Sequence, residues 1–230
     1  MSGWSIRRLH RARDLVAGRR YLEVGVRKGE TFFGIDMPEK DAVDPVFAFP
    51  EAKRNQPGCR FFEITSDAFF SSKEARRDYD VVFLDGLHTF EQILRDFCAT
   101  LSSVSERPII LLDDTVPSDI YSAERSPDRA RKLRALAGAP GASWHGDVFK
   151  VVFFLHDFFP NLSFATFQGG GNPQTIVWRA PRGEFKPIFN DVEAIKRMTY
   201  GDFVQLQSHT RPMGEDAIFA EIAAAYGSGG

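Results

Sequence analysis

Near the middle of the chain, an apolar run ends in residues that can do chemistry. Residues 81–84 are Val-Val-Phe-Leu, Asp85 and Gly86 follow them, and His88 comes three residues after the aspartate. Asp-Gly is a common turn dipeptide, so an ordinary turn is one interpretation. A carboxylate beside an imidazole is also typical of a metal site or a proton-transfer site, because histidine titrates near neutral pH. The residues alone leave all three interpretations open.

A second apolar run, residues 109–112, ends in the adjacent carboxylates Asp113 and Asp114. Two neighbouring carboxylates repel each other, and a cation or a basic partner relieves that repulsion. If both runs are neighbouring strands of a parallel sheet, Asp85 and Asp113 end at the same edge and can converge on one ion. No cysteine is near, and oxygen ligands favour Mg²⁺, Ca²⁺ or Mn²⁺ over zinc.

The elements that must position these residues alternate between strand and helix. Five strand-then-helix units predict right-handed crossovers and an α/β fold. We expect a doubly wound, mostly parallel, seven-stranded Rossmann-like sheet closed by an antiparallel hairpin. Strands are predicted in residues 20–26, 41–47, 59–65, 79–85 and 107–114, the hairpin in 162–168 and 172–180, and helices in 5–20, 28–37, 66–77, 89–104, 127–137 and 146–159.

Some finer expectations accompany this pattern. The helix at 66–77 is expected to be capped by Ser66 or Asp67. The arginines of the helix at 5–20 are expected to form a solvated face. Residues 181–230 fit the alternation poorly, so we expect one domain over 1–180 and an extension, 181–230, packed on it.

Composition narrows the class of protein. The chain has 230 residues, a net charge of −2 and two cysteines. The charge predicts neither a nucleic-acid nor a membrane partner, and two cysteines suit a reducing compartment. No run of 18 apolar residues exists and the N-terminus lacks an apolar signal core, so we expect a cytoplasmic protein. The 22 phenylalanines are compatible with a homodimer.

The loop after the first predicted strand reads "EVGVRKGET". Gly25 and Gly29 are four residues apart, without the middle glycine of a dinucleotide fingerprint, and Glu23 and Glu30 would repel a phosphate. Asp44 ends the second predicted strand, where a carboxylate can hold two ribose hydroxyls. A plain strand-to-helix turn explains the glycines nearly as well, but the combination favours an adenosine-containing ligand without a diphosphate.

These motifs resemble class I S-adenosylmethionine-dependent methyltransferases. "LEVGVRKGET" looks like their first motif, E/D-x-G-x-x-x-G-x-T, and "AVDP" looks like their ribose-binding strand end. "FLDGLHTFEQILRDF" and "IILLDD" are similar to a subgroup of bacterial small-molecule O-methyltransferases that includes the macrocin- and mycinamicin-type sugar enzymes.

The resemblance implies S-adenosylmethionine as cofactor, a divalent cation such as Mg²⁺, and a hydroxylated small-molecule acceptor of the sugar or nucleotide-sugar class. Its motif positions imply that Glu23, Gly25, Gly29 and Thr31 line the methionine end of the cofactor, that Asp44 holds the ribose and that Ser66 and Asp67 flank the adenine. They also imply that Asp85, Asp113 and Asp114 hold the metal and that His88 is the catalytic base, with Asp85 beside it. Many relatives have an acidic residue where this chain has Leu87, which gives His88 more weight as the base.

Two other functions stay open at this point. A nicotinamide-dependent oxidoreductase is disfavoured by the missing glycine and the acidic neighbours. A non-catalytic module of the same fold could bind cofactor without turnover. The histidines outside the motif, His145 among them, are assigned structural roles by default, although the loop that carries His145 could face the site.

Overall fold

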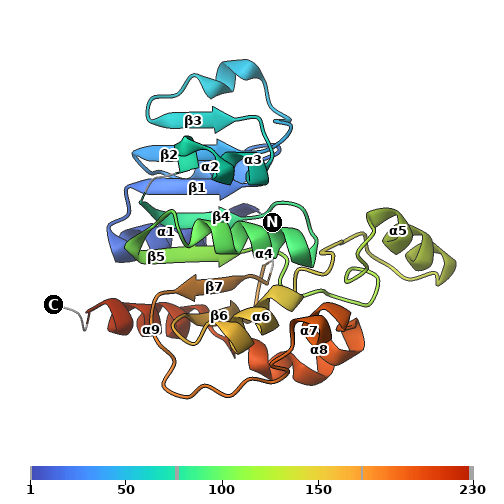
Figure 1. Cartoon of the computed structure of the whole chain (residues 1–230). Coiled ribbons are helices and arrows are strands. Elements are labelled where there is room, and N and C mark those ends of the chain that lie inside the picture. Colours follow the sequence, from blue (N-terminus) through green and yellow to red (C-terminus); the bar gives the residue numbers. More distant parts are fainter. Residues whose placement is uncertain (1, 76–77, 172, 228–230) are drawn as a thin grey trace.

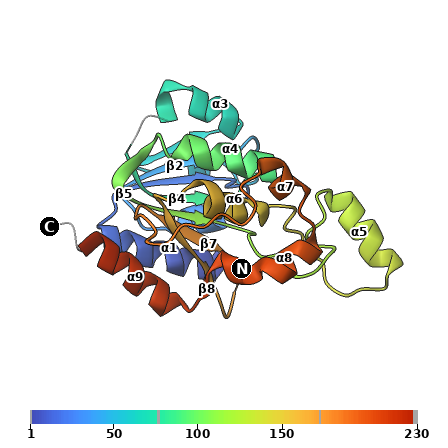
Figure 2. The ribbon, with the colours of Figure 1, turned by 60° about the horizontal axis from the view of Figure 1, so that its bottom comes forward.

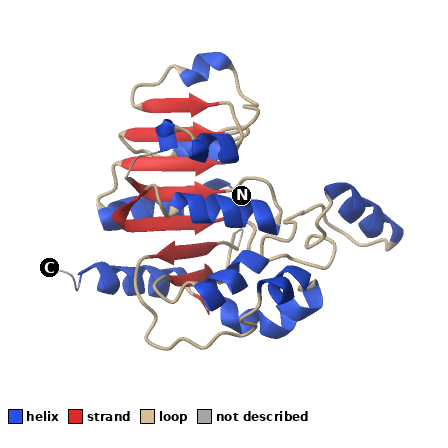
Figure 3. Ribbon diagram, viewed as in Figure 1, coloured by secondary structure: helices blue, strands red, loops and turns tan. Residues whose placement is uncertain are grey.

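One sheet of eight strands runs through the molecule, which is seen here in a computed structural model that describes residues 2–75, 78–171 and 173–227 (Figures 1 and 3). The strand order is β3-β2-β1-β4-β5-β7-β6-β8. Neighbours from β3 to β5 are parallel, and β7 runs antiparallel to both β5 and β6. The strands are β1 (Arg20–Val24), β2 (Glu39–Val43), β3 (Cys59–Phe62), β4 (Tyr79–Leu84), β5 (Val104–Leu112), β6 (Ser163–Phe167), β7 (Thr175–Trp178) and β8 (Pro212–Met213).

The α/β class and the doubly wound, mostly parallel sheet with its closing hairpin are confirmed, but the sheet has one strand more than expected. The extra strand is β8, which pairs in parallel with β6. Two residues are too few to show the alternation from which strands are predicted. Three predicted positions, 76, 77 and 172, lie outside the described residues.

Helices cover both faces of the sheet because its central strands are apolar on both sides. Val82 and Leu84 of β4 point into one core, and Val81 and Phe83 point into the other. The first core is closed by α3, α4, α6, α7 and α8, and the second by α1, α2 and α9 (Figure 2). The helices are α1 (Ser2–Val16), α2 (Glu30–Gly34), α3 (Ser66–Ser71), α4 (Phe90–Thr100), α5 (Pro127–Leu136), α6 (Lys150–Phe158), α7 (Val192–Arg197), α8 (Tyr200–Leu206) and α9 (Glu215–Gly227).

The carboxyl ends of β1 to β5 lie along one edge of the sheet, on the side from which α5 projects in Figure 1. The chain winds outward in both directions from β1 and β4, so the topological switch point lies between these two strands. Ligands of doubly wound sheets bind outside the strand ends at this point. The sheet therefore brings the residues after β1, β4 and β5 to one place.

The expectation of a solvated arginine face on the first helix is wrong for Arg8. Its side chain is only 1% exposed and lies over the ring of Phe167. Arg7 and Arg11 on the same helix are more exposed and pair with Glu215 at the start of α9. The C-terminal helix thus covers part of a helix face that the sequence assigned to solvent. Within the described residues, no helix is both long enough and apolar enough to cross a membrane.

Candidate active site

Glu23 is the second-to-last residue of β1, at the edge of the sheet where the parallel strands end. It is buried and accepts a hydrogen bond of 2.6 Å from the hydroxyl of Tyr21. Burial raises the pKa of Glu23 to about 8, and the nearby charge of Asp85 acts in the same direction, while the Tyr21 hydrogen bond opposes them. A buried carboxyl of this kind is a ready partner for a ligand cation.

The glycine loop brings β1 against β4. Gly25 has a φ of 91°, and a Cβ atom added there would stand 1.8 Å from the carbonyl oxygen of Asp85. Only glycine fits this close approach. Gly29, also left-handed, precedes α2, and Thr31 lies in the first turn of that helix. The loop therefore presents backbone where the resemblance places the methionine end of the cofactor.

Asp44 follows β2, and its carboxylate ties two loops together. One oxygen accepts the backbone N–H of Arg27 at 2.8 Å, and the other accepts that of Val46 at 2.8 Å. Each carboxylate oxygen can accept a further hydrogen bond. The structure thus fixes the orientation of Asp44 and leaves acceptor capacity for two ribose hydroxyls.

Ser66 and Asp67 form the first turn of α3 and face α4. The side-chain amide nitrogen of Gln92 lies 3.1 Å from an oxygen of each. The expected cap is wrong, because Thr65 caps the helix by accepting the backbone N–H of Ala68. Ser and Thr are both favoured caps, so the strand end had to be known before the capping residue could be chosen.

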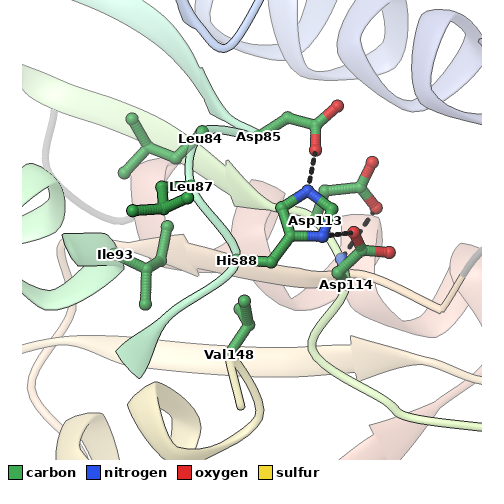
Figure 4. Close-up of a pocket in the computed structure, with 9 residues that line it drawn as sticks. Leu84, Asp85, Leu87, His88, Ile93, Asp113, Asp114 and Val148 are labelled. Carbon is green, nitrogen blue, oxygen red and sulfur yellow. Dashed lines mark hydrogen bonds and ion pairs between the residues drawn. The ribbon is translucent and has the colours of Figure 1, made fainter. Parts of the chain in front are cut away.

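The outer part of the edge holds a histidine between two carboxylates (Figure 4). The Nδ1 atom of His88 lies 3.0 Å from Asp114 Oδ2, and its Nε2 atom lies 3.6 Å from Asp85 Oδ1. A small pocket opens here, lined by these three residues together with Leu84, Gly86, Leu87, Ile93, Asp113 and Val148. The structure thus brings together the two strand-end motifs found in the sequence.

Charge on His88 balances this acidic pocket. Burial lowers the pKa of the imidazole, but its contacts with Asp114 and Asp85 outweigh burial and raise it to about 10. Burial raises the pKa of Asp85 to about 6 despite the proximity of His88. In the ligand-free protein at neutral pH, His88 is therefore an imidazolium.

Asp113 and Asp114 have different roles although they are adjacent. Asp114 has a φ of 56°, a left-handed conformation that is unusual for a residue with a side chain. Asp113 instead accepts hydrogen bonds on Oδ1 from the backbone N–H of Asp114, at 2.9 Å, and from Gln174, at 3.2 Å. Burial and the charges of Asp85 and Asp114 raise the pKa of Asp113 well above its usual range.

The group that could hold a metal consists of Asp85, His88 and Asp114. One ligand atom from each lies within 4.8 Å of the others. Ligands on opposite sides of one Ca²⁺ or Mg²⁺ stand about 4–5 Å apart, so these side chains fit an ion. The group differs from the sequence-based set because it has His88 where that set has Asp113.

Two further residues reach the site from the loop after α5. The ring of Trp144 stacks on His88 with centroids 4.8 Å apart and planes 12° from parallel. His145 is buried, and its Nε2 atom lies 3.6 Å from Asp114 Oδ1. Gly146 allows this approach, since a Cβ atom there would stand 1.8 Å from the carbonyl oxygen of His88.

Sequence reasoning treated His145 as structural, and it gave Trp144 no role. The glycine after Trp144 and His145 indicates a turn. It does not indicate which part of the molecule these two side chains contact. The loop reaches the site because its backbone is anchored: the N–H of His145 donates to Ser122, and the indole of Trp144 donates to Glu124.

Comparison with known proteins points to a methyltransferase domain in the first half of the chain. Residues 2–115 match the family model described as a methyltransferase domain. No curated protein matches the sequence significantly.

Solved structures share the fold at low sequence identity. A candidate O-methyltransferase from Klebsiella pneumoniae is 13% identical, with a TM-score of 0.52 over 78% of this chain and 89% of that one. A candidate caffeoyl-CoA O-methyltransferase from Staphylococcus aureus is 11% identical, with a TM-score of 0.52 over 77% and 83%. The SAH-bound methyltransferase PaMTH1 from Podospora anserina is 16% identical, with a TM-score of 0.51 over 77% of each chain.

Proposed function

We propose that this chain is a class I S-adenosylmethionine-dependent methyltransferase that methylates a hydroxyl oxygen of a small molecule in the cytoplasm. A sugar or nucleotide-sugar is the proposed acceptor class, on the resemblance of the "DGLHTFEQ" and "LLDD" motifs. The observation that carries the proposal is the position of His88. It lies in a pocket between Asp85 and Asp114. Glu23 lies at the same edge of the sheet, outside the residues that line this pocket.

An O-methyltransferase must deal with the proton of its acceptor. A hydroxyl is about as acidic as water, so free alkoxide at pH 7 would lie roughly 12 kcal/mol uphill. In the proposed reaction the hydroxyl oxygen attacks the methyl carbon, the sulfur–carbon bond breaks with its electron pair on sulfur, and the hydroxyl proton passes to a protein base. A positioned base contributes about 10²–10⁴ in rate.

His88 can take this proton only after it has lost the one that it holds in the free protein. Its pKa is raised by two carboxylates, so positive charge brought near them acts in the opposite direction. The cofactor carries a sulfonium and an ammonium, and both would approach the acidic edge. We propose that the arrival of this charge prepares His88 to act as the base, with Asp85 and Asp114 orienting its ring.

His145 is a second candidate for the same proton. Its Nε2 atom faces Asp114, while its Nδ1 atom is buried without a hydrogen-bond partner among the described residues. Burial lowers the pKa of His145, so the ring is neutral at pH 7. An imidazole that is oriented by a carboxylate on one side and unpartnered on the other has the form of a general base.

Asp85 and Asp114 would supply carboxylate ligands for a divalent ion, which would acidify a coordinated hydroxyl, and His88 between them would stay available as the base. The other proposed contacts concern the cofactor. Glu23 would face its ammonium, Asp44 its ribose hydroxyls, and Ser66 and Asp67 its adenine.

Calorimetry tests the cofactor first. S-adenosylmethionine and S-adenosylhomocysteine should bind with micromolar affinity and NAD should not, with and without Mg²⁺. Preference for NAD would contradict the proposal. Transfer of labelled methyl from S-adenosylmethionine to a panel of sugars and nucleotide-sugars then separates the enzyme from a non-catalytic binding module. Cofactor binding without transfer to any hydroxyl of the panel would favour the module.

A further inference from the structure

We propose that Gln174 is a positioning residue that holds Asp114 in its strained conformation through Asp113. The hydrogen-bond part of this inference stands on contacts within the chain. Its functional part rests on the proposed role of Asp114 beside His88.

The orientation of the Gln174 amide is determined by its partners. Gln174 is fully buried just before β7, and its oxygen accepts a hydrogen bond of 2.8 Å from Arg8. An arginine can only donate, so the amide oxygen must face it. The amide nitrogen therefore faces the other way, 2.8 Å from the hydroxyl of Ser5 and 3.2 Å from Asp113 Oδ1.

Two donors meet at that one oxygen of Asp113. The second is the backbone N–H of Asp114. The hydrogen bond fixes the peptide group that precedes a left-handed residue, a conformation that persists only when its surroundings hold it. The Asp114 side chain then reaches His88 Nδ1. A loosened Asp113 would release this peptide group and, with it, the carboxylate beside the histidine.

The anchor behind Gln174 comes from both ends of the chain. Arg8 of α1 is buried against Phe167, and Glu215 of α9 lies 3.4 Å from its Nε atom. A buried guanidinium also offsets the negative charge of the carboxylates at the edge. Burial lowers the pKa of Arg8, and the charges of Glu215 and, less strongly, Asp113 oppose that effect. Residues of the first helix, the hairpin and the last helix thus support the site from behind. The sequence motifs at the site give no indication of these supporting residues.

The test compares wild type with Q174M, which removes the amide at nearly constant volume, and with the control Q168M, at an exposed position on the same hairpin. Hydrogen exchange of the Asp114 backbone amide is followed by NMR. Q174M removes the hydrogen bond from Gln174 to Asp113. If Asp113 then turns away, the Asp114 N–H loses its bond to that carboxylate, and its exchange should speed up about ten- to a hundredfold. Amides of Ile110 and Val177 in the sheet should exchange as in wild type, as should all three amides in Q168M.

Mn²⁺ binding, measured by electron paramagnetic resonance, reports the functional consequence. If Q174M releases the Asp114 carboxylate, one of the proposed ligands, Mn²⁺ binding should weaken about 10–100-fold. Affinity for S-adenosylhomocysteine should stay within about twofold, because Gln174 lies behind Asp113 and not at the cofactor loop. A general loss of stability would be expected to weaken both Mn²⁺ and S-adenosylhomocysteine binding.

Unchanged Asp114 exchange in Q174M would overturn the inference. If wild type binds no Mn²⁺, the metal part of the proposed function fails, and the exchange comparison still decides the role of Gln174. If Q174M does not fold, the same measurements are made on Q174N. Its amide is one methylene shorter and cannot span Arg8 and Asp113, so faster exchange supports the inference and wild-type exchange overturns it.

Discussion

The two halves of the sheet edge differ in how far apart in sequence their contacting residues lie. On the side of β1 and β2, where we propose that the cofactor binds (the cofactor side), the partners are close in sequence: Glu23 bonds Tyr21, and Asp44 bonds the backbone of Arg27 and Val46. On the side of β4 and β5, the partners are distant: Trp144 stacks on His88, and Gln174 holds Asp113.

This difference has a physical origin. A Rossmann-like loop must follow its own strand closely, so its hydrogen bonds are local and its sequence is correspondingly constrained. The acceptor side must hold several carboxylates together in a buried place, and their repulsion has to be relieved by groups from elsewhere. Here those groups are an imidazolium, a buried amide and a buried guanidinium. Substitutions at four positions, His88, Glu23, Asp44 and Thr65, test the contrast between the local and the long-range side.

The largest expected effect is on the long-range side. His88→Ala should reduce turnover by roughly 10²–10⁴ while leaving S-adenosylmethionine binding intact, because a base speeds the chemical step and faces the acceptor. Turnover of wild type should rise with pH, and its midpoint should lie below the value of about 10 that describes the free protein, since bound positive charge lowers the pKa of His88. Initial rates with a hydroxylated acceptor, from pH 6 to 10, provide the measurement.

His88→Gln keeps a hydrogen bond but cannot accept a proton at neutral pH, so it should be as slow as His88→Ala. Wild-type rates in both variants would assign the proton to another group, and His145→Gln would then be expected to abolish turnover.

On the local side, Glu23 should make the ligand-free protein less stable as pH rises. Its pKa is about 8 in the folded protein and close to 4.5 when unfolded, so the folded state holds a proton that the unfolded state has lost. The contribution is neutral below pH 4.5, becomes unfavourable between pH 4.5 and 8 and is constant above 8. Glu23→Gln keeps an acceptor for Tyr21 and should gain a few kcal/mol over wild type across that window, on the order of 1.36 kcal/mol per unit of pKa.

Urea unfolding at pH 5 and pH 8.5 measures this gain. Glu184→Gln, at an exposed position, serves as the control. Its difference from wild type in free energy of unfolding should be the same at both pH values. An equal free energy of unfolding for Glu23→Gln and wild type at pH 8.5 would show that Glu23 is already ionised without penalty.

Asp44→Ala should weaken S-adenosylmethionine by about ten- to a hundredfold, the worth of roughly 1.5–3 kcal/mol for hydrogen bonds to a charged group. The structure adds a second consequence, because the variant also loses the bonds to Arg27 and Val46 and should unfold more easily. Calorimetry and thermal unfolding on the same variant separate the two. Unaltered cofactor affinity would remove Asp44 from the ribose site.

The smallest effect concerns the helix that follows β3. Thr65→Ala should lower the free energy of unfolding by about 1 kcal/mol, the usual loss for a removed N-cap. Ser66→Ala, one residue further on, removes no cap and should have less effect on stability. If Ser66→Ala is the more destabilising of the two, the assignment of Thr65 as the cap is wrong.

The cofactor side was the easier side to predict from sequence. Gly25, Gly29 and Asp44 lie close to the predicted strand ends, because turn residues are recognised in short stretches of sequence. The predicted strands 20–26 and 41–47 nevertheless extended past the observed ends at Val24 and Val43. The catalytic roles of Asp85 and His88, and the ligand roles of the cofactor residues, stay predictions until ligands are bound. The expected metal set was modified, since Asp113 turns toward Gln174 and His88 takes its place in the group.

The sequence by itself determined the order of the strands and helices up to residue 180, and it placed the carboxylates and the histidine near strand ends. Apolar periodicity and turn chemistry act over a few residues, so they can be read without a structure. Only the tertiary structure decided which side chains surround His88, that Arg8 is buried and that Gln174 supports Asp113. Those contacts join segments as much as 207 residues apart, and no local pattern encodes which distant partner will neutralise a buried charge.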